Sequence, residues 1–445
     1  MLSRFFQLDR HQTTPGRELQ AGLTTFAAMA YILAVNPDIL ANAGMDRAAL
    51  ITVTALTAAI ATTLMALLTN FPIALAPGMG INAFFTFTIC LTYKVAWQEA
   101  LGMVFVNGVI FLALSVTGVR EKIMASIPHA MKVAVTCGIG MFIAFIGLKE
   151  GGVIVANQAT FVGPGDFTAG GTWLCLAGIA LTAILVARRL TGAIVLSIAV
   201  VTIAGLFVSA GNGHTVTELP QKFVSLPASP APVFLHLSFK FLTDLESFKA
   251  ALPLILTLLL VDMFDNIGTL IAVTKRAGLV DAEGRLPRAG RALLADSIAT
   301  LLSALCGTST VVSYIESASG VAAGGRTGLT SLTTAVLMLL ALFLTPLILI
   351  IPSAATAPAL VIVGVFMMQS VGEIPMDDFV QAAPAVLTIF AIPLTFSIAQ
   401  GLGIGMILCA LFALALGRPK SVTPIGYAVA ALFFLEFFKL WPFHR

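Results

Sequence analysis

The chain has 445 residues, of which 58% are hydrophobic and 10% charged, with a net charge of +3 and a mean hydropathy of +1.01. Repeated apolar runs of about 17 to 25 residues exclude a soluble protein of this size and indicate an all-α polytopic membrane protein in a lipid bilayer. The runs are too long and too rarely alternating for an outer-membrane barrel. The basic residues form no cluster interleaved with aromatics, so no nucleic-acid partner is expected.

Fourteen apolar runs are expected to cross the membrane, in two sets of seven. They are 18–41, 48–69, 72–92, 97–119, 129–148, 171–188 and 190–209, followed by 250–274, 288–306, 308–324, 327–351, 354–372, 382–398 and 399–417. The longest polar interruption, 210–249, is typical of an extramembrane connection between the sets. The segment 421–441 is either a further span or an interfacial helix, and its aromatic end around Glu436 and Lys439 favours the interface.

If the N-terminus is cytoplasmic, most Lys and Arg residues lie in cytoplasmic segments. The positive-inside rule therefore predicts a cytoplasmic N-terminus. The N-terminal segment is polar and basic, without the apolar core of a signal peptide. We expect a multi-pass protein of the inner membrane. The cysteines and histidines show no metal-ligand spacing, so neither a metal nor a cofactor is expected.

The sequence contains no pattern typical of catalysis, so the protein is not expected to be an enzyme. The Gly-rich string AAGGRTG (322–328) lacks the GK[ST] ending of a nucleotide-binding loop.

An odd number of spans in each half gives the halves opposite orientations, which predicts an inverted repeat. Two pairs of segments support this expectation. The segments 127–148 and 351–371 both begin with Ile-Pro and continue to a Gly-containing apolar centre. The segments 74–85 and 309–325 both start rich in Pro or β-branched residues and then become small around Gly. Each of the latter two is expected to be a broken helix at mid-membrane, in the third and tenth runs.

A helix broken at this depth is tolerated where it lines a polar cavity, and the half-helix after the break presents free N–H donors. Asn82 follows Gly80 at one break, and Glu316 and Ser317 lie at the other. Together they offer donors and acceptors to a flat polar molecule. For the small residues, close helix packing is the alternative interpretation.

Four acids stand in or beside apolar runs: Asp262, Asp265, Asp296 and Glu316. A carboxylate at the bilayer centre costs roughly 2.5 to 3.5 kcal/mol even on lenient scales, so each indicates a polar pathway or a partner. Asp265 and Thr269 share a helical face, with Asp262 close to it. Such acids are candidates for proton uptake and release. Alternatively, Asp262 is a hydrogen-bonded packing residue, and Asp296 pairs with Arg288 or Arg291 at the interface.

Four strings resemble the AzgA-like purine nucleobase permeases of the nucleobase/cation symporter-2 group. They are AGLTTFAAMAYILAVNP (21–37), LAPGMGINAFF (75–85), FDNIGTLIAVTKRAGL (264–279) and GTSTVVSYIESASGVAAGGRTGLT (307–330). The resemblance implies a fourteen-helix fold with a moving core domain and a gate domain. The expected parts are a cytoplasmic N-terminus (1–17), core (18–119 and 250–351), gate (120–209 and 352–417), an extracytoplasmic linker (210–249) and a C-terminal segment (418–445).

The resemblance also implies site residues. The nucleobase-binding acids of the family correspond to Asp265 and Glu316, and the family's polar position in the ninth run corresponds to Asp296. The family's half-helix in the third run corresponds to Gly80 to Ala83, with Asn82 as its polar side chain. Thr269 and Ser317 complete the expected substrate site. Asp265, Asp296 and Glu316 are the expected proton-coupling residues, and Asp262 lies outside the family pattern.

The resulting expectation is a proton symporter for a purine nucleobase. The run 147–166 looks nearer to the adenine permeases, so adenine is the first choice, followed by hypoxanthine or guanine. An anion transporter of similar fold, for a bicarbonate- or sulfate-like substrate, and a passive channel are the alternatives. An anion site should place a cation opposite the half-helices, and a channel would show no proton coupling. The sequence leaves the oligomeric state open, a homodimer included.

Overall fold

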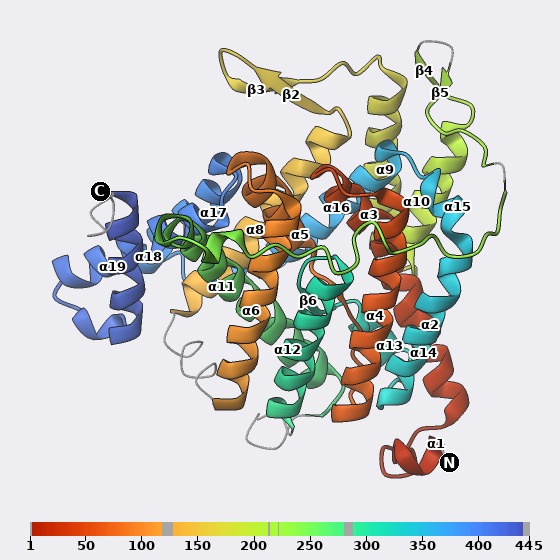
Figure 1. Cartoon of the computed structure of the whole chain (residues 1–445), viewed down its shortest axis with the longest axis horizontal. Coiled ribbons are helices and arrows are strands. Elements are labelled where there is room, and N and C mark those ends of the chain that lie inside the picture. The colour runs from red at the N-terminus through yellow and green to blue at the C-terminus, as the bar shows by residue number, and fades with distance from the viewer. Residues whose placement is uncertain (1, 118–127, 212–213, 221, 280–287, 439–445) are drawn as a thin grey trace.

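The computed structural model describes residues 2–117, 128–211, 214–220, 222–279 and 288–438. Helices dominate the molecule (Figure 1). Within the described ranges, eight helical segments are long and apolar enough to cross a membrane. The predicted class of helical membrane protein is confirmed, whereas the count of fourteen crossings stays a prediction.

The first half of the chain follows the predicted runs closely, with one interruption. Its elements are α1 (Leu2–Phe5), α2 (Pro15–Met29), α3 (Ile32–Ala41), α4 (Arg47–Thr69), β1 (Leu75–Pro77), α5 (Met79–Ala83), the π-helix η1 (Phe84–Thr92), α6 (Trp97–Thr117), α8 (His129–Glu150), α9 (Gly170–Ala187) and α10 (Ala193–Gly205). The expected run 18–41 is interrupted at Ala30 and Tyr31. Leu33 N–H there donates to Ala30 O and Ala34 N–H to Tyr31 O, so the helix tightens into a 3₁₀-like turn.

The second half contains α11 (Leu245–Arg276), α12 (Ala289–Cys306), β6 (Val311–Ser313), α13 (Ser317–Ala322), α14 (Gly328–Ala341), η3 (Leu342–Leu344), α15 (Thr345–Leu349), α16 (Ser353–Met368), η4 (Gln369–Glu373), α17 (Phe379–Thr395), α18 (Ile398–Ala415), η5 (Pro419–Ser421) and α19 (Pro424–Phe437). The runs 382–398 and 399–417 form two separate helices. A Cβ at Gly401 would meet Ile392, and a Cβ at Gly405 would meet Thr388, so α17 and α18 pack antiparallel.

Short hairpins and a long connection lie outside the helices. Strands β2 (Ile154–Asn157) and β3 (Phe161–Pro164) form one hairpin, and β4 (Ser209–Gly211) and β5 (His214–Thr215) form another. Both hairpins lie at the end of the molecule opposite α1 (Figure 1). The connection toward α11 contains only the short 3₁₀ helix η2 (Lys240–Leu242) within its described residues. The chain therefore has a hairpin-bearing face and an N-terminal face.

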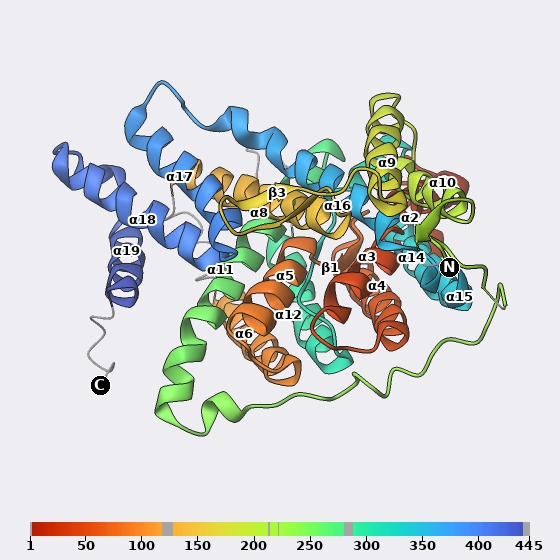
Figure 2. The ribbon, with the colours of Figure 1, turned by 90° about the horizontal axis from the view of Figure 1, so that it is seen from above.

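The helices pack in two groups. Helices α8, α9, α16 and α17 lie along one side of the molecule seen from above, and α3, α4, α6 and α12 lie along the other (Figure 2). Gly140 on α8 and Gly364 on α16 leave no room for a Cβ, because a Cβ at Gly364 would overlap the carbonyl oxygen of Gly140. The two backbones approach closely there, as small residues permit in membrane helices.

A two-stranded antiparallel pair, β1 with β6, lies near the centre of the molecule (Figures 1 and 2). Leu75 pairs with Ser313 and Pro77 with Val311, and Gly78 N–H adds a bond to Thr310 O. The predicted breaks in the third and tenth runs are confirmed: each of these two segments starts as a short extended strand, β1 or β6, and a short helix, α5 or α13, follows. The unwound segments satisfy their backbone groups by pairing with each other, since the membrane interior offers no water.

Candidate functional site

Two short helices, α5 and α13, begin at opposite ends of the β1–β6 pair. A hydrogen bond links α13 to the residue before β1, and another links α5 to a residue before β6. The Ser317 hydroxyl at the start of α13 accepts from Ala74 N–H at 3.0 Å. The Ser309 hydroxyl before β6 donates to Oδ1 of Asn82 on α5. The pair and its reciprocal links hold both half-helices in a fixed relation.

Glu316 directly precedes α13 and is half-buried. Its Oε1 accepts a hydrogen bond from the Tyr31 hydroxyl at 2.6 Å, and its backbone carbonyl accepts from the Ser319 hydroxyl at 2.6 Å. A carboxylate has about four acceptor positions, so Glu316 has capacity for further donors.

Asn82 is fully buried, and both ends of its amide are engaged. Its Nδ2 donates to Oδ1 of Asn36 on α3 at 2.5 Å, and its Oδ1 accepts from Ser309. Asn36 in turn donates to the Thr54 hydroxyl at 2.6 Å and to the Thr308 hydroxyl at 3.4 Å. In this conformation Asn82 fixes α5, and direct contact with a substrate would require exchange of one of these bonds.

Gly80 and Ala83 lie on α5 and are buried. A Cβ at Gly80 would overlap Cγ2 of Ile139 on α8, so Gly80 permits close contact between these helices. This contact supports the packing interpretation for Gly80, while a substrate-binding role for either residue stays a prediction.

Three of the predicted polar residues stand on α11. Asp262 is buried and accepts from Asn107 Nδ2 on α6 at 3.3 Å, as expected for a hydrogen-bonded packing residue. Asp265 lies within α11, but its side chain falls outside the described residues. Thr269 is half-buried. The neighbouring Asn266 accepts from Ser313 N–H at 3.3 Å, which docks α11 onto β6.

Asp296 lies on α12 with 1% of its surface exposed, so it is buried within the protein. Arg288, one of its two expected partners, donates to the carbonyl oxygen of Thr69 at 2.9 Å. Among the described residues, no group of three His, Cys, Asp or Glu side chains is placed to hold a metal ion.

Sequence reasoning missed two residues of this site, Tyr31 and Asn36. Both stand in the first apolar run, where a buried amide or phenol needs a hydrogen-bonding partner. That need was a usable signal for Asn36, because a fully buried Asn in such a run carries the same desolvation argument as the acids. The partners themselves lie far away in sequence and become visible only in the fold.

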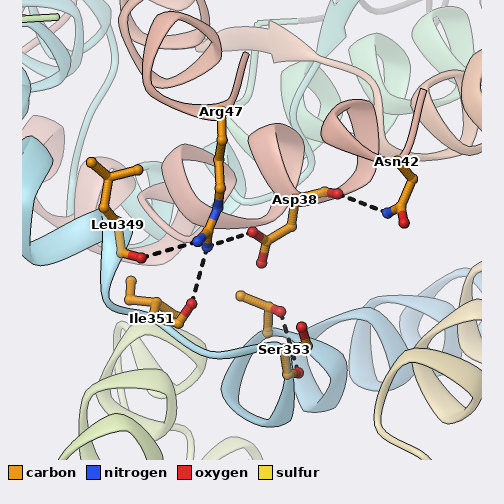
Figure 3. A network of polar contacts seen from close by, with 7 residues as sticks. Asp38, Asn42, Arg47, Leu349, Ile351 and Ser353 are labelled. Carbon is orange, nitrogen blue, oxygen red and sulfur yellow. Dashed lines mark hydrogen bonds and ion pairs between the residues drawn. The ribbon is translucent and has the colours of Figure 1, made fainter. Parts of the chain in front are cut away.

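A second polar network joins the start of α4 to the connection between α15 and α16 (Figure 3). Arg47 forms an ion pair with Asp38 at 2.5 Å and donates to the carbonyl oxygens of Leu349 and Ile351, each at 3.0 Å. A cavity of about 340 Å³ lies beside the network. It is lined by residues of α3, η1, α8 and α16, including Asp38, Phe87, Glu150, Ser353 and Thr356.

Residues 16–404 match the model of a family described as a permease family, Xan_ur_permease. The guanine/hypoxanthine permease PbuG of Bacillus subtilis is 43% identical over 448 residues, covering 99% of this chain and 100% of PbuG. The adenine permease AdeP of Escherichia coli is 40% identical over 437 residues, covering 98% of this chain and 96% of AdeP.

The transmembrane domain of the cyanobacterial bicarbonate transporter BicA has a similar structure, with a TM-score of 0.66 over 88% of this chain and 97% of that domain. Its sequence is 16% identical, so this likeness shows a shared fold alone. The family match and the two full-length relatives show that the chain belongs to the Xan_ur_permease family of multi-pass membrane permeases, which confirms the resemblance to the AzgA-like permeases.

Proposed function

We propose that this permease carries a purine nucleobase into the cell across the inner membrane together with a proton. Relatives named as guanine/hypoxanthine and adenine permeases support the substrate class. The observation that carries the proposal is the carboxylate of Glu316 at the start of α13, beside the β1–β6 pair. A carboxylate accepts a purine ring N–H when ionised and donates to a ring nitrogen when protonated.

The same observation favours a base over an anion, although the fold is shared with a bicarbonate transporter. An anion bound at half-helix N-termini is best matched by a cation. The hydrogen bonds described above for Glu316, Asn82 and Ser317 all have uncharged partners. These partners are Tyr31, Asn36, Ala74, Ser309 and Ser319. An acid among neutral donors suits an uncharged heterocycle.

We assign residues 18–119 and 250–351 to a core that moves against a gate formed by 120–209 and 352–417. The close approach of α8 to α16 at Gly140 and Gly364 supports one rigid gate. The links between β1, β6, α5 and α13 support one rigid core. Gly80 against Ile139 then marks a contact between the two bodies. Movement of one body against the other gives alternating access in transporters of this type.

We assign proton coupling to Glu316, Asp265 and Asp296. We expect adenine to be the preferred substrate, followed by hypoxanthine or guanine. The segment 147–166 that suggested adenine lies at the end of α8 and in the β2–β3 hairpin, far along the chain from the half-helices. The named relatives include both substrate types at similar identity. The base preference is therefore a question for competition between bases, and uptake of labelled nucleobase by a purine-transport-deficient bacterium tests the whole proposal.

The orientation is assigned with the N-terminus in the cytoplasm and the two hairpins outside. In this orientation the Arg47 network lies at the outer face, where it ties α3 and α4 of the core to the connection that leads into α16 of the gate. We therefore expect Arg47 to restrain the opening of the cavity beside it.

Arg47→Gln should speed the reaction of a membrane-impermeant thiol reagent with a cysteine placed at Thr356. Thr356 lines the cavity but is buried, so its labelling requires opening, and the five native cysteines are also buried. Loss of hydrogen bonds from a charged donor costs roughly 1 to 2 kcal/mol here, which raises the open fraction about 5- to 30-fold. Equal labelling rates with and without Arg47 would remove its restraining role. Labelling of inverted vesicles but not of intact cells would instead reverse the assigned orientation.

A further inference from the structure

The contact between Tyr31 and Glu316 joins residues 285 positions apart in the chain. Tyr31 stands at the tightened turn between α2 and α3 and has 2% of its surface exposed. Its hydroxyl donates a hydrogen bond to Oε1 of Glu316 at 2.6 Å. The hydrogen bond therefore reaches the side chain that the proposed function places against the substrate.

The partner of Tyr31 differs from the partners of two other tyrosines. The Tyr314 hydroxyl donates to the backbone carbonyl of Pro77 at 2.6 Å, and the Tyr427 hydroxyl donates to that of Pro419 at 3.1 Å. Tyr314 is buried, so a backbone carbonyl is enough to satisfy a buried phenol. Tyr31 donates to a flexible acid instead, and this bond restricts the rotamers of the Glu316 side chain.

Such a restriction matters for binding because an unrestrained glutamate loses rotamer freedom when it engages a ligand. One hydrogen bond to Oε1 fixes the carboxylate before the ligand arrives and leaves the other acceptor positions to a ring N–H. The backbone of Glu316 is already held by the Ser319 hydroxyl, so Tyr31 supplies the restraint that the side chain needs.

The same helix reaches the other half-helix. Asn36, five residues after Tyr31, accepts from Asn82 on α5 at 2.5 Å. Helix α3 is thus bonded at Tyr31 to the residue that precedes α13 and at Asn36 to the middle of α5. A shift of α3 would move the polar groups of both half-helices together.

We propose that Tyr31 is a positioning residue that presents Glu316 to the nucleobase, and that α3 keeps the two half-helices in register through Tyr31 and Asn36. This assignment rests on the proposed function, because it treats Glu316 as a ligand of the base. Tyr31 acts through Glu316 and has no required contact with the substrate.

Tyr31→Phe removes the hydroxyl and preserves the ring, and it should weaken adenine binding to the purified full-length protein about tenfold. The specific readout is a double-mutant cycle. In a Glu316→Ala background there is no carboxylate to position, so adding Tyr31→Phe should change binding less than about twofold. Tyr427→Phe is the matched control, because it removes a phenol hydroxyl that donates to the backbone carbonyl of Pro419, far along the chain from the half-helices.

The outcomes separate the inference from the proposed function. If the wild-type protein binds no nucleobase, the proposed function fails. If Glu316→Gln weakens binding but Tyr31→Phe binds like wild type, or weakens binding equally in the Glu316→Ala background, the positioning role alone is overturned. Should Tyr31→Phe fail to fold, para-fluorophenylalanine at position 31 fills the space of the hydroxyl without a donor. Binding between that of wild type and Glu316→Ala then supports the role, and binding like wild type contradicts it.

Discussion

Glu316→Gln is expected to weaken purine binding about ten- to a hundredfold. The change keeps the size of the side chain and the acceptor for Tyr31 but removes the negative charge. A hydrogen bond to a charged group contributes roughly 1.5 to 3 kcal/mol, and its loss leaves a ring N–H poorly matched. Calorimetry on purified protein measures the effect without interference from expression level.

Asp377→Asn is the matched control, because Asp377 is exposed in the loop between η4 and α17 and should leave binding unchanged. A Glu316→Gln protein that binds purine as strongly as the wild type would remove Glu316 from the site. A loss of the same size in Asp377→Asn would show that the assay responds to something other than the site.

Concentrative uptake is expected to collapse to equilibration when a protonophore dissipates the proton gradient. It should also rise as the external pH falls, because a carboxylate that carries the proton must be protonated from the outside before the core moves. A tenfold accumulation corresponds to about 1.4 kcal/mol, which a membrane potential and pH gradient together readily supply. Accumulation of labelled base in intact cells, with and without protonophore, gives the measurement.

Accumulation that follows a sodium gradient and ignores the protonophore would contradict proton coupling while leaving the nucleobase site intact. Uptake that equilibrates but never concentrates would favour the passive channel.

Asp296→Asn tests the proposed proton relay, because it removes a titratable group at a buried position on α12. We expect that variant to retain binding and to lose part of its accumulation.

The positions of the helices were predictable from sequence because hydrophobic length is a local property. The breaks in the third and tenth runs were also predictable, since Pro77, Gly78 and Gly80 in one and the β-branched segment 310–312 in the other cannot continue a uniform helix. The interruption at Tyr31 was not predictable in this way. Its backbone remains in the right-handed helical region and differs from an ordinary helix only in its hydrogen bonds.

Part of the candidate site was predictable from sequence, because the cost of desolvating a carboxylate in an apolar run singles out acidic residues. That cost identified Glu316, and the expected helix breaks pointed to Asn82 and Ser317, but neither argument could supply the partners of these residues. Tyr31 and Ser309 meet these residues from more than two hundred positions away. The pairing of β1 with β6 likewise depends on two segments that are brought together only by folding. The role of Asp265 stays a prediction.

The measurement that tests the central claim most directly is uptake of radiolabelled adenine by a bacterium that lacks its own purine transport and expresses this protein. Each unlabelled base, namely adenine, guanine, hypoxanthine, xanthine and uracil, is added in turn as a competitor, with bicarbonate as the anion control. We predict saturable uptake that purine bases reduce, adenine most strongly, and that bicarbonate leaves unchanged. Failure of every base to enter or to compete would contradict the assignment of this permease to purine nucleobases.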